Sequence, residues 1–232
     1  MTLRTPADSL AGATAELLQE HDVADLLLRL TQDAARFAGG DAAGLLVRTN
    51  GGPLELLAAT SHRATYIELF QAQRDEGPCI DVVRTGQAVA ATGRDEIVAR
   101  WPVVGPAIVA AGFAAVHAFP LDWQGGLIGG LNIFGQDAAV LDDDGSRAAR
   151  ALADMLTLVI VQPDHLHADE LDLRVTRALG GRAVVEQAKG ALAYQLGIEP
   201  AEAYDVLLDR SVREGHTLTH VAREVLRRAQ RR

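Results

Sequence analysis

The sequence predicts an α+β fold, in which an N-terminal domain with an antiparallel sheet and flanking helices precedes a small all-α domain. Up to about residue 162, short apolar runs joined by turn residues alternate with helical patterns. After Pro163, every periodic segment has helical spacing. The charge also changes, because residues 1–171 carry 11 basic and 23 acidic residues (−12), whereas 11 basic and eight acidic residues from Asp172 onward leave +3. We therefore expect two domains, 1–162 and 163–232.

The composition is that of a globular protein, with 232 residues, 48% hydrophobic and 23% charged. No run of 18 apolar residues suggests a membrane span, and the N-terminus does not resemble a secretory leader. With a single cysteine, Cys79, the chain is expected in the reducing cytoplasm. Of the 22 basic residues only Lys189 is lysine, which makes that position informative.

The first elements are helical. Residues 7–38 predict two helices broken near Glu20-His21-Asp22, and Gly39-Gly40 ends the second. The apolar runs Ala42–Arg48 and Leu54–Thr60 flank an Asn-Gly-Gly-Pro turn, so they predict a hairpin.

A mixed region of helix and loop is expected from about residue 64 to 112. Two further strands follow, Ala114–Pro120 and Leu127–Phe134, and alternation in the second places Asn132 on the face opposite its apolar residues. A long helix over about 142–161 closes the domain.

Four apolar stripes with helical spacing follow Pro163, and Gly197 and Gly215 separate the last three. Pro200 begins the third helix, and Thr217 is placed to cap the fourth. Because helices this short need tertiary packing, the last three should form a compact bundle.

The helix over 182–196 carries the most informative surface. Arg182, Glu186 and Lys189 fall opposite its apolar stripe. Gly190 costs roughly 1 kcal/mol relative to alanine inside a helix, and a close approach by a ligand or another helix would explain it. The alternative is a solvated, salt-bridged face with a packing glycine, which composition alone favours.

Two other groups near the C-terminus also have ordinary structural interpretations. The arginines of the tail could contact phosphates or simply keep a helix face solvated; they are Arg223, Arg227, Arg228, Arg231 and Arg232. His216 and His220 have a spacing seen in zinc sites, but no cysteine or further motif accompanies them, so no metal site is predicted.

The first domain offers candidate sensor residues. Cys79 is either a redox-sensing thiol or a small buried hydrophobe. A ligand pocket is hypothesised from the residues Cys79, Trp101, His117, Phe119 and Trp123, which could instead simply fill the core. No nucleophile, phosphate-loop or metal motif is found, so no enzyme activity or catalytic residue is expected.

Two sets of motifs are similar to known families. The run Arg182-Ala-Val-Val-Glu-Gln-Ala-Lys-Gly-Ala-Leu192, followed by Gly197-Ile198, Glu202-Ala203-Tyr204, Leu207 and Leu218-x-x-Val221-Ala222, resembles an ANTAR domain. The upstream segments resemble the actinobacterial GAF domain that accompanies it; they are Asp75–Asp81, Arg100-Trp101-Pro102, Ala118–Leu121 and Leu127–Asn132.

The resemblance implies a transcription antitermination regulator whose ANTAR domain binds paired RNA hairpins in nascent transcripts, under the control of a GAF sensor for a small molecule or a redox signal. It implies a homodimer formed through a coiled-coil-like helix at about 164–181. It places RNA contacts at Arg182, Ala188, Lys189, Gly190 and Thr217. No cofactor is specified, and the GAF ligand is not identified.

Three departures from the ANTAR pattern bear on affinity rather than fold. Leu208 stands where arginine is usual, Gly215 stands where a polar residue is usual, and Gly180-Gly181 weakens the helix before Arg182. The alternative function is a protein-interaction or scaffold regulator with a GAF sensor and no RNA binding. A ligand-binding enzyme and a DNA-binding helical regulator are two further functions that the sequence leaves open.

Overall fold

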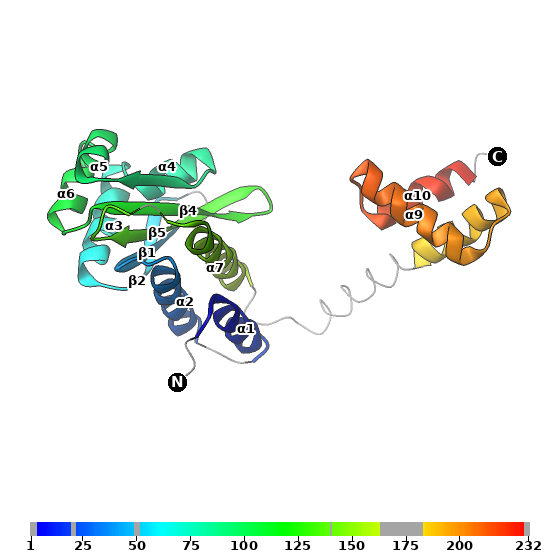
Figure 1. Ribbon diagram of the computed structural model, residues 1–232, viewed down its shortest axis with the longest axis horizontal. Coiled ribbons are helices and arrows are strands. Elements are labelled where there is room, and N and C mark those ends of the chain that lie inside the picture. Colours follow the sequence, from blue (N-terminus) through cyan, green and yellow to red (C-terminus); the bar gives the residue numbers. More distant parts are fainter. Residues whose placement is uncertain (1–3, 20–21, 49–51, 140, 163–182, 230–232) are drawn as a thin grey trace. The chain divides into compact units, whose positions relative to one another are not determined.

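The computed structural model describes residues 4–19, 22–48, 52–139, 141–162 and 183–229. The chain divides into two compact units, Met1–Gln162 and Pro163–Arg232, and each is described by itself (Figure 1). Within the described residues, no helix is both long and apolar enough to cross a bilayer.

The first unit begins with two separately capped helices. Helix α1 spans Pro6–Leu17, where Thr5 and Asp8 form a capping box. Helix α2 spans Val23–Phe37, and the Asp22 carboxylate accepts two backbone N–H bonds at its first turn. The two helices expected between residues 7 and 38 are therefore confirmed, with a break where the sequence indicated one.

Five antiparallel strands form the sheet, in the spatial order β2-β1-β5-β4-β3. Their bounds are Ala42–Arg48 (β1), Leu54–Ala59 (β2), Val89–Thr92 (β3), Ala115–Trp123 (β4) and Gly126–Gly135 (β5). The β1–β2 and β4–β5 hairpins agree with the sequence prediction. Strand β3 was missed, because four residues at the sheet edge are too few to show alternation.

Helices α3 to α6 occupy most of the segment predicted as mixed helix and loop. They span His62–Arg74 (α3), Pro78–Thr85 (α4), Arg94–Arg100 (α5) and Gly105–Ala110 (α6). The closing helix α7 spans Asp143–Val161, and the Asp142 side chain caps its first turn.

The sheet has a different helical layer on each face. Helices α1, α2 and α7 lie together on one face (Figure 1), and we call this the α7 face. Its core includes Leu26, Leu30, Leu131, Ile133, Leu152 and Leu156. The opposite face, covered by α3 to α6, is called the α3 face, and its core includes Ile67, Val82, Trp101, Val104, Phe113 and Phe134. Alternation along β4 and β5 assigns neighbouring residues to opposite cores.

The second unit contains three described helices: residues 183–196, α9 (Pro200–Glu214) and α10 (Leu218–Ala229). Gly197 and Gly215 have positive φ angles, +65° and +66°, which end the first two helices as predicted. The Thr217 hydroxyl accepts a hydrogen bond from the His220 backbone N–H and so caps α10. The expected leading helix, at about 164–181, lies outside the described residues.

Candidate functional site: a helix surface in the second unit and two cavities in the first

The helix over residues 183–196 presents a continuous solvent-facing stripe. Ala183, Gln187, Gly190 and Tyr194 are spaced i, i+4, i+7 and i+11, and all four are exposed. Val185 and Ala188 lie on the other side, in the bundle core with Leu207, Val221, Ala222 and Val225. We call the four exposed residues the outward face.

The residues expected to bind RNA are distributed around this helix rather than gathered in one patch. Lys189 lies at the edge of the outward face, where its Nζ is 2.5 Å from a carboxylate oxygen of Glu186. Ala188 is fully buried, so its side chain packs the core and does not reach a ligand. The Thr217 hydroxyl serves as the cap of α10. Arg182 lies outside the described residues.

Gly190 has no packing role that the structure reveals. It is exposed within the helix, and no described atom would lie within 4 Å of a Cβ atom added to it. The interpretation that this glycine admits a neighbouring helix of the same bundle therefore has no support among the described residues. The cost of glycine in a helix interior, roughly 1 kcal/mol relative to alanine, is offset by no contact within them.

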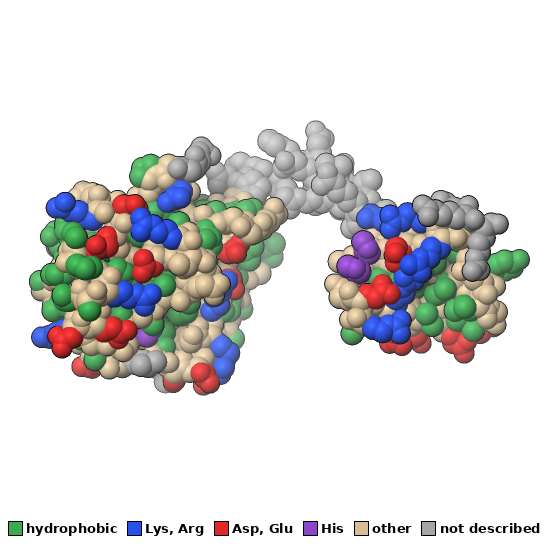
Figure 2. Space-filling model, turned by 90° about the horizontal axis from the view of Figure 1, so that it is seen from above, with side chains coloured by type: hydrophobic (Ala, Val, Ile, Leu, Met, Phe, Trp, Pro, Cys, Tyr) green, Lys and Arg blue, Asp and Glu red, His purple; other side chains and the backbone are tan. Residues whose placement is uncertain are grey.

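Charge is segregated over the second unit. Helix α9 and its N-cap residue Glu199 carry four exposed carboxylates, Glu199, Glu202, Asp205 and Asp209, and the ion pairs of the described residues include none of them. We call these the acidic stripe. In the view of Figure 2, both basic and acidic side chains lie beside the histidines of the second unit, and further acidic side chains lie along its lower edge. Polyanions should therefore avoid the α9 side.

Arg210 on α9 forms an ion pair with α10. Its guanidinium donates to Glu214 on its own helix and to Glu224 on α10, both at 2.8 Å. Arg228 also contacts Glu224, at 3.3 Å. These arginines therefore serve partly as structural groups, so the basic character of the bundle surface is lower than the count of arginines suggests.

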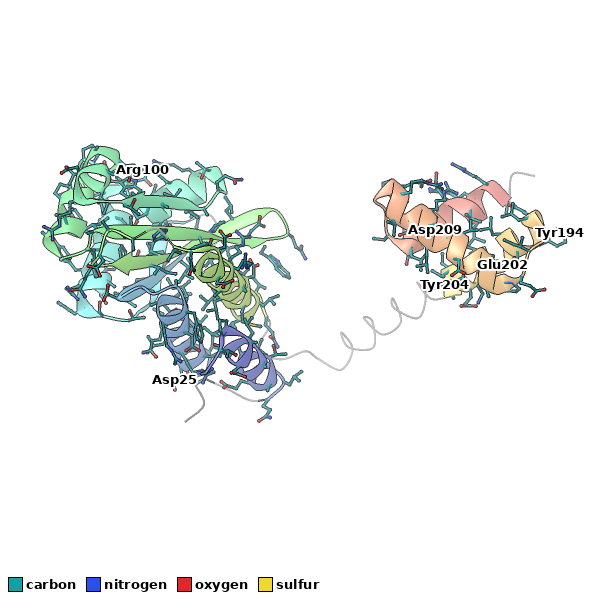
Figure 3. The ribbon with its side chains drawn as sticks, in the orientation of Figure 1. Asp25, Arg100, Tyr194, Glu202, Tyr204 and Asp209 are labelled. Carbon is teal, nitrogen blue, oxygen red and sulfur yellow. The ribbon has the colours of Figure 1, made fainter. Side chains whose placement is uncertain are left out.

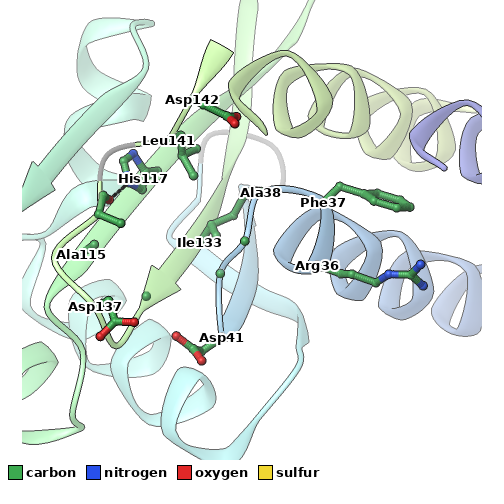
Figure 4. Close-up of a pocket in the computed structure, with 14 residues that line it drawn as sticks. Arg36, Phe37, Ala38, Asp41, Ala115, His117, Ile133, Asp137, Leu141 and Asp142 are labelled. Atoms are coloured by element: carbon green, nitrogen blue, oxygen red, sulfur yellow. Dashed lines mark hydrogen bonds between the residues drawn. The ribbon is translucent and has the colours of Figure 1, made fainter. Parts of the chain in front are cut away.

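His117 lines two cavities on the α7 face of the described part of the first unit, and Figure 4 shows the larger one. The larger, about 420 Å³, lies between the end of α2, strands β4 and β5, and the start of α7. The smaller, about 200 Å³, is lined by Phe119, Leu141 and Ser146 together with residues 88–90. Sites of a few hundred Å³ hold small organic ligands.

His117 is mostly buried at the boundary of these cavities. Its Nε2 lies 3.3 Å from the Ala139 carbonyl oxygen, the contact drawn as a dashed line in Figure 4. Burial lowers the pKa of His117 below its ordinary value, although the Ala139 contact opposes this shift. A neutral imidazole at this position can both donate and accept a hydrogen bond.

The structure separates the five residues predicted to line one pocket. His117 and Phe119 line the cavities of the α7 face, whereas Cys79 and Trp101 are buried on the α3 side of the sheet and line neither cavity. Trp123, 40% exposed near the tip of the β4–β5 hairpin, also lines neither. A single pocket formed by all five residues is therefore not what the structure shows.

The segment Asp75–Asp81 mainly holds loops in place. One oxygen of Glu76 accepts the backbone N–H groups of Val103 and Val104, at 2.8 and 2.9 Å. A carboxylate oxygen of Asp81 accepts the Trp101 indole N–H at 3.0 Å. This motif therefore joins the start of α4 to the loop between α5 and α6, and its charged residues do not face the cavities.

A buried polar cluster on the α3 face was not predicted from the sequence. Glu68 on α3 is fully buried, and its carboxyl group accepts hydrogen bonds from Asn132 on β5, at 2.8 and 2.9 Å, and from Gln71, at 2.5 Å. Gln71 in turn accepts the Cys79 backbone N–H at 3.1 Å. Burial raises the pKa of Glu68 to about 8, and the two side-chain hydrogen bonds oppose that shift.

Glycines make room for this cluster. A Cβ at Gly44 would overlap the Glu68 side chain, and one at Gly130 would come within 2.8 Å of the Cys79 sulfur. The sequence contained one clue, since Asn132 was expected on the face opposite its apolar neighbours. The partner Glu68 lies 64 residues away and could not be identified from spacing.

The buried environment of Cys79 predicts that its thiol reacts slowly in the folded protein. The sulfur belongs to a fully buried residue, and burial, together with the nearby Glu68 carboxylate, raises the pKa of the thiol well above its ordinary value. Because the thiolate is the reactive form, a thiol reagent should modify the native protein roughly a hundredfold or more slowly than the urea-unfolded chain. Rapid modification with unchanged tryptophan fluorescence would instead favour a redox-sensing role for this thiol.

The fold defines the class of protein. The first unit is a five-stranded antiparallel sheet with helical layers on both faces and cavities at one of them, and the second unit is a compact helical bundle. Solved structures share the first unit. The GAF domain of a cyanobacterial phytochrome, bound to phycocyanobilin, is 17% identical, with a TM-score of 0.53 over 72% of this chain and 100% of that one.

Two other solved GAF domains show the same fold. That of the Acinetobacter phosphoenolpyruvate-protein phosphotransferase is 13% identical, with a TM-score of 0.52 over 68% of this chain and 94% of that one. That of the Coxiella burnetii phosphotransferase is 18% identical, with a TM-score of 0.50 over 67% and 92%. A search of curated proteins found no match.

Family models identify both parts of the chain. The GAF domain model matches residues 20–161, and the ANTAR domain model matches residues 174–226. The chain belongs to the GAF family and carries a C-terminal ANTAR domain, which is the architecture of antitermination regulators. ANTAR is an RNA-binding antitermination domain and GAF is a sensor domain; neither is a catalytic domain.

Proposed function

We propose that this protein is a homodimeric antitermination regulator that binds RNA hairpins in nascent transcripts through the helix over residues 183–196, in the cytoplasm. The observation that supports this proposal is the exposed Gly190 on the outward face. An RNA loop that approaches the helix backbone would explain a glycine that no described intramolecular contact requires. Lys189 at the edge of this face, and Arg182, four residues before Glu186 in the sequence, would supply positive charge for phosphates.

The geometry of the GAF domain offers a route for control. The larger cavity is lined by Leu141 and Asp142, and Asp142 caps α7. We propose that a small ligand in this cavity favours one position of the α7 start over another, which would require different affinities for the two arrangements. His117 is placed to hydrogen-bond this ligand.

The substitution Gly190→Ala tests RNA binding with two readouts of opposite sign. The methyl group meets no described atom, so the variant should be more stable by roughly 1 kcal/mol in urea unfolding of the bundle, followed by circular dichroism. If RNA lies against this backbone, the same variant should bind a hairpin RNA at least about tenfold more weakly, because the added carbon blocks the approach.

The RNA for this test is selected by the wild-type full-length protein from a pool of paired hairpins with randomised loops. Gln195→Ala is the matched control, since it raises helix propensity in the same helix but lies off the outward face. Failure of the wild type to select any hairpin would contradict the proposed function. Equal RNA affinities of Gly190→Ala and wild type would contradict the proposed surface.

A specific observation favours the second candidate function, a protein-interaction regulator without RNA binding. The acidic stripe on α9 is exposed and accompanied by the exposed apolar side chains of Leu208 and Val212. A basic, partly apolar protein surface would complement it. Binding to a protein partner that survives removal of all RNA, with no hairpin selected, would favour this candidate.

A further inference from the structure

Tyr194 is the most exposed large hydrophobic side chain of the described residues, at 91%. Figure 3 shows it projecting from the end of the 183–196 helix. The ring is exposed to water, and it makes no ring contact, hydrogen bond or hydrophobic-cluster contact among the described residues. The residues beside Tyr194 on the helix therefore determine which ligand the ring can contact.

Gly190 lies one turn before Tyr194 on the outward face. Helix side chains lean toward the N-terminus, so a residue at position i covers the surface over i−4. Any longer side chain at position 190 would pack against the Tyr194 ring. Because position 190 is glycine, and no described atom would lie within 4 Å of a Cβ added there, no side chain from that position covers the Tyr194 ring.

The helix surface over Gly190 is open, since no described atom would lie within 4 Å of a Cβ added there. We call this surface, between Gln187 and Tyr194, the slot; the seven residues from one to the other rise about 10 Å along the helix. Successive nucleotides of one DNA strand rise about 3.4 Å, so this length exceeds that of one base and one stacked ring. Sequence-specific RNA recognition uses bases that are splayed from loops and stacked on aromatic side chains.

Charge decides which ligand this slot favours. The acidic stripe occupies α9, where Figure 3 places Glu202 and Asp209, and it would repel phosphates. The outward face carries no carboxylate of its own, and the adjacent Glu186 is paired with Lys189. A polyanion with exposed bases is therefore better accommodated at this face than on α9.

We propose that Tyr194 is a stacking platform for one unpaired base of the RNA loop, which lies over Gly190. This inference rests on the proposed function and adds a residue outside the motif by which the chain resembles an ANTAR domain. Tyrosine contributes its π face rather than its hydroxyl, so the slot fixes the position of a base more strongly than its identity.

The experiment uses the full-length protein and the selected hairpin, with 2-aminopurine placed at each loop position in turn. Stacking on Tyr194 should change the fluorescence of one loop position on binding, and Tyr194→Leu should remove that change. Tyr194→Leu and Tyr194→Ala should weaken binding about ten- to hundredfold, while Tyr194→Phe stays within about twofold of wild type. Val212→Ala, which trims another exposed apolar residue, is the control and should bind as wild type does.

A salt series separates stacking from charge. Tyr194→Leu should leave the dependence of log Kd on log salt unchanged, since no phosphate contact is lost, whereas Lys189→Ala should reduce that slope by about one. If wild type binds the hairpin and Tyr194→Ala binds equally well, only the stacking proposal is overturned. A Tyr194→Ala variant that alters the oligomeric state but not RNA affinity also overturns it. If wild type binds no hairpin, the proposed function fails, and this proposal fails with it.

Discussion

The substitution Glu68→Gln should remove the decrease in GAF-domain stability between about pH 5 and pH 8, and leave the contribution of His117, which has the opposite sign. Burial raises the pKa of Glu68 from 4.5 to about 8. Within this range the folded domain keeps the carboxyl proton, whereas the unfolded chain has released it. Unfolding therefore releases a proton, and the free energy of unfolding decreases as the pH rises.

The contribution of Glu68 is complete below the unfolded pKa of 4.5 and is lost as the pH passes through about 8. At roughly 1.4 kcal/mol per pH unit, the wild-type domain loses several kcal/mol over this interval. Glutamine has the size of the protonated acid and is neutral at every pH. The variant should therefore be markedly more stable than wild type at pH 8.

Urea unfolding followed by tryptophan fluorescence is the measurement, because Trp101 and Trp123, the two tryptophans of the chain, both lie in the GAF domain. The series ends below pH 9, where unfolded Cys79 begins to ionise. Glu55→Gln, on the exposed side of β2, is the control and should follow the wild-type curve. Parallel curves for Glu68→Gln and wild type would contradict a protonated, buried Glu68.

The second large effect is expected from Gly129→Ala in the central strand β5. Gly129 pairs with Val47 on β1 and with Leu121 on β4. A Cβ at this position would overlap the Leu46 carbonyl oxygen and lie 2.9 Å from the Val47 Cα. Both atoms belong to the backbone of the neighbouring strand, which cannot rotate away as a side chain can. The pairing of β1 with β5 must therefore shift.

Gly129→Ala should destabilise the GAF domain by roughly 3 kcal/mol or more. Gly126→Ala, in the same strand, is the matched control, since its Cβ would meet only the Trp123 carbonyl oxygen, at 3.3 Å. Tryptophan-monitored urea unfolding compares the two variants. An effect of Gly129→Ala no larger than that of the control would show that the sheet yields more easily than its packing indicates.

Much of the architecture was predictable because its causes are local. The glycines at 197 and 215 and the proline at 200 define helix ends through the residues beside them. The separation of Asn132 from its apolar neighbours also followed from strand alternation. Strand β3 was not predicted, because its four residues are too few to show alternation, and its pairing with β4 joins residues more than 20 positions apart in the chain.

The candidate sites were less predictable because they depend on tertiary contacts. Chemical type suggested that Trp101 and Cys79 would line a pocket, but the indole N–H of Trp101 is satisfied by Asp81 and Cys79 lies against Gln71. Ala188 belonged to a conspicuous motif but packs the core. The sequence did not identify Tyr194 as a candidate binding residue, because its exposure and the open space at Gly190 are visible only in the structure.

The polar cluster around Glu68 makes the two faces of the GAF sheet differ in the space that they leave for a ligand. Carboxyl, amide and thiol groups fill the interior beneath α3 and α4, and Gly44 and Gly130 are already needed to fit them. A guest molecule on that side would have to displace buried side chains that hydrogen-bond to one another, whereas a guest on the α7 side would enter space that is already open. Among the described residues, the interior under α3 therefore leaves no room for a ligand. The proposed small ligand would instead act on the helical layer of the α7 face, whose helix α7 ends the described part of the domain.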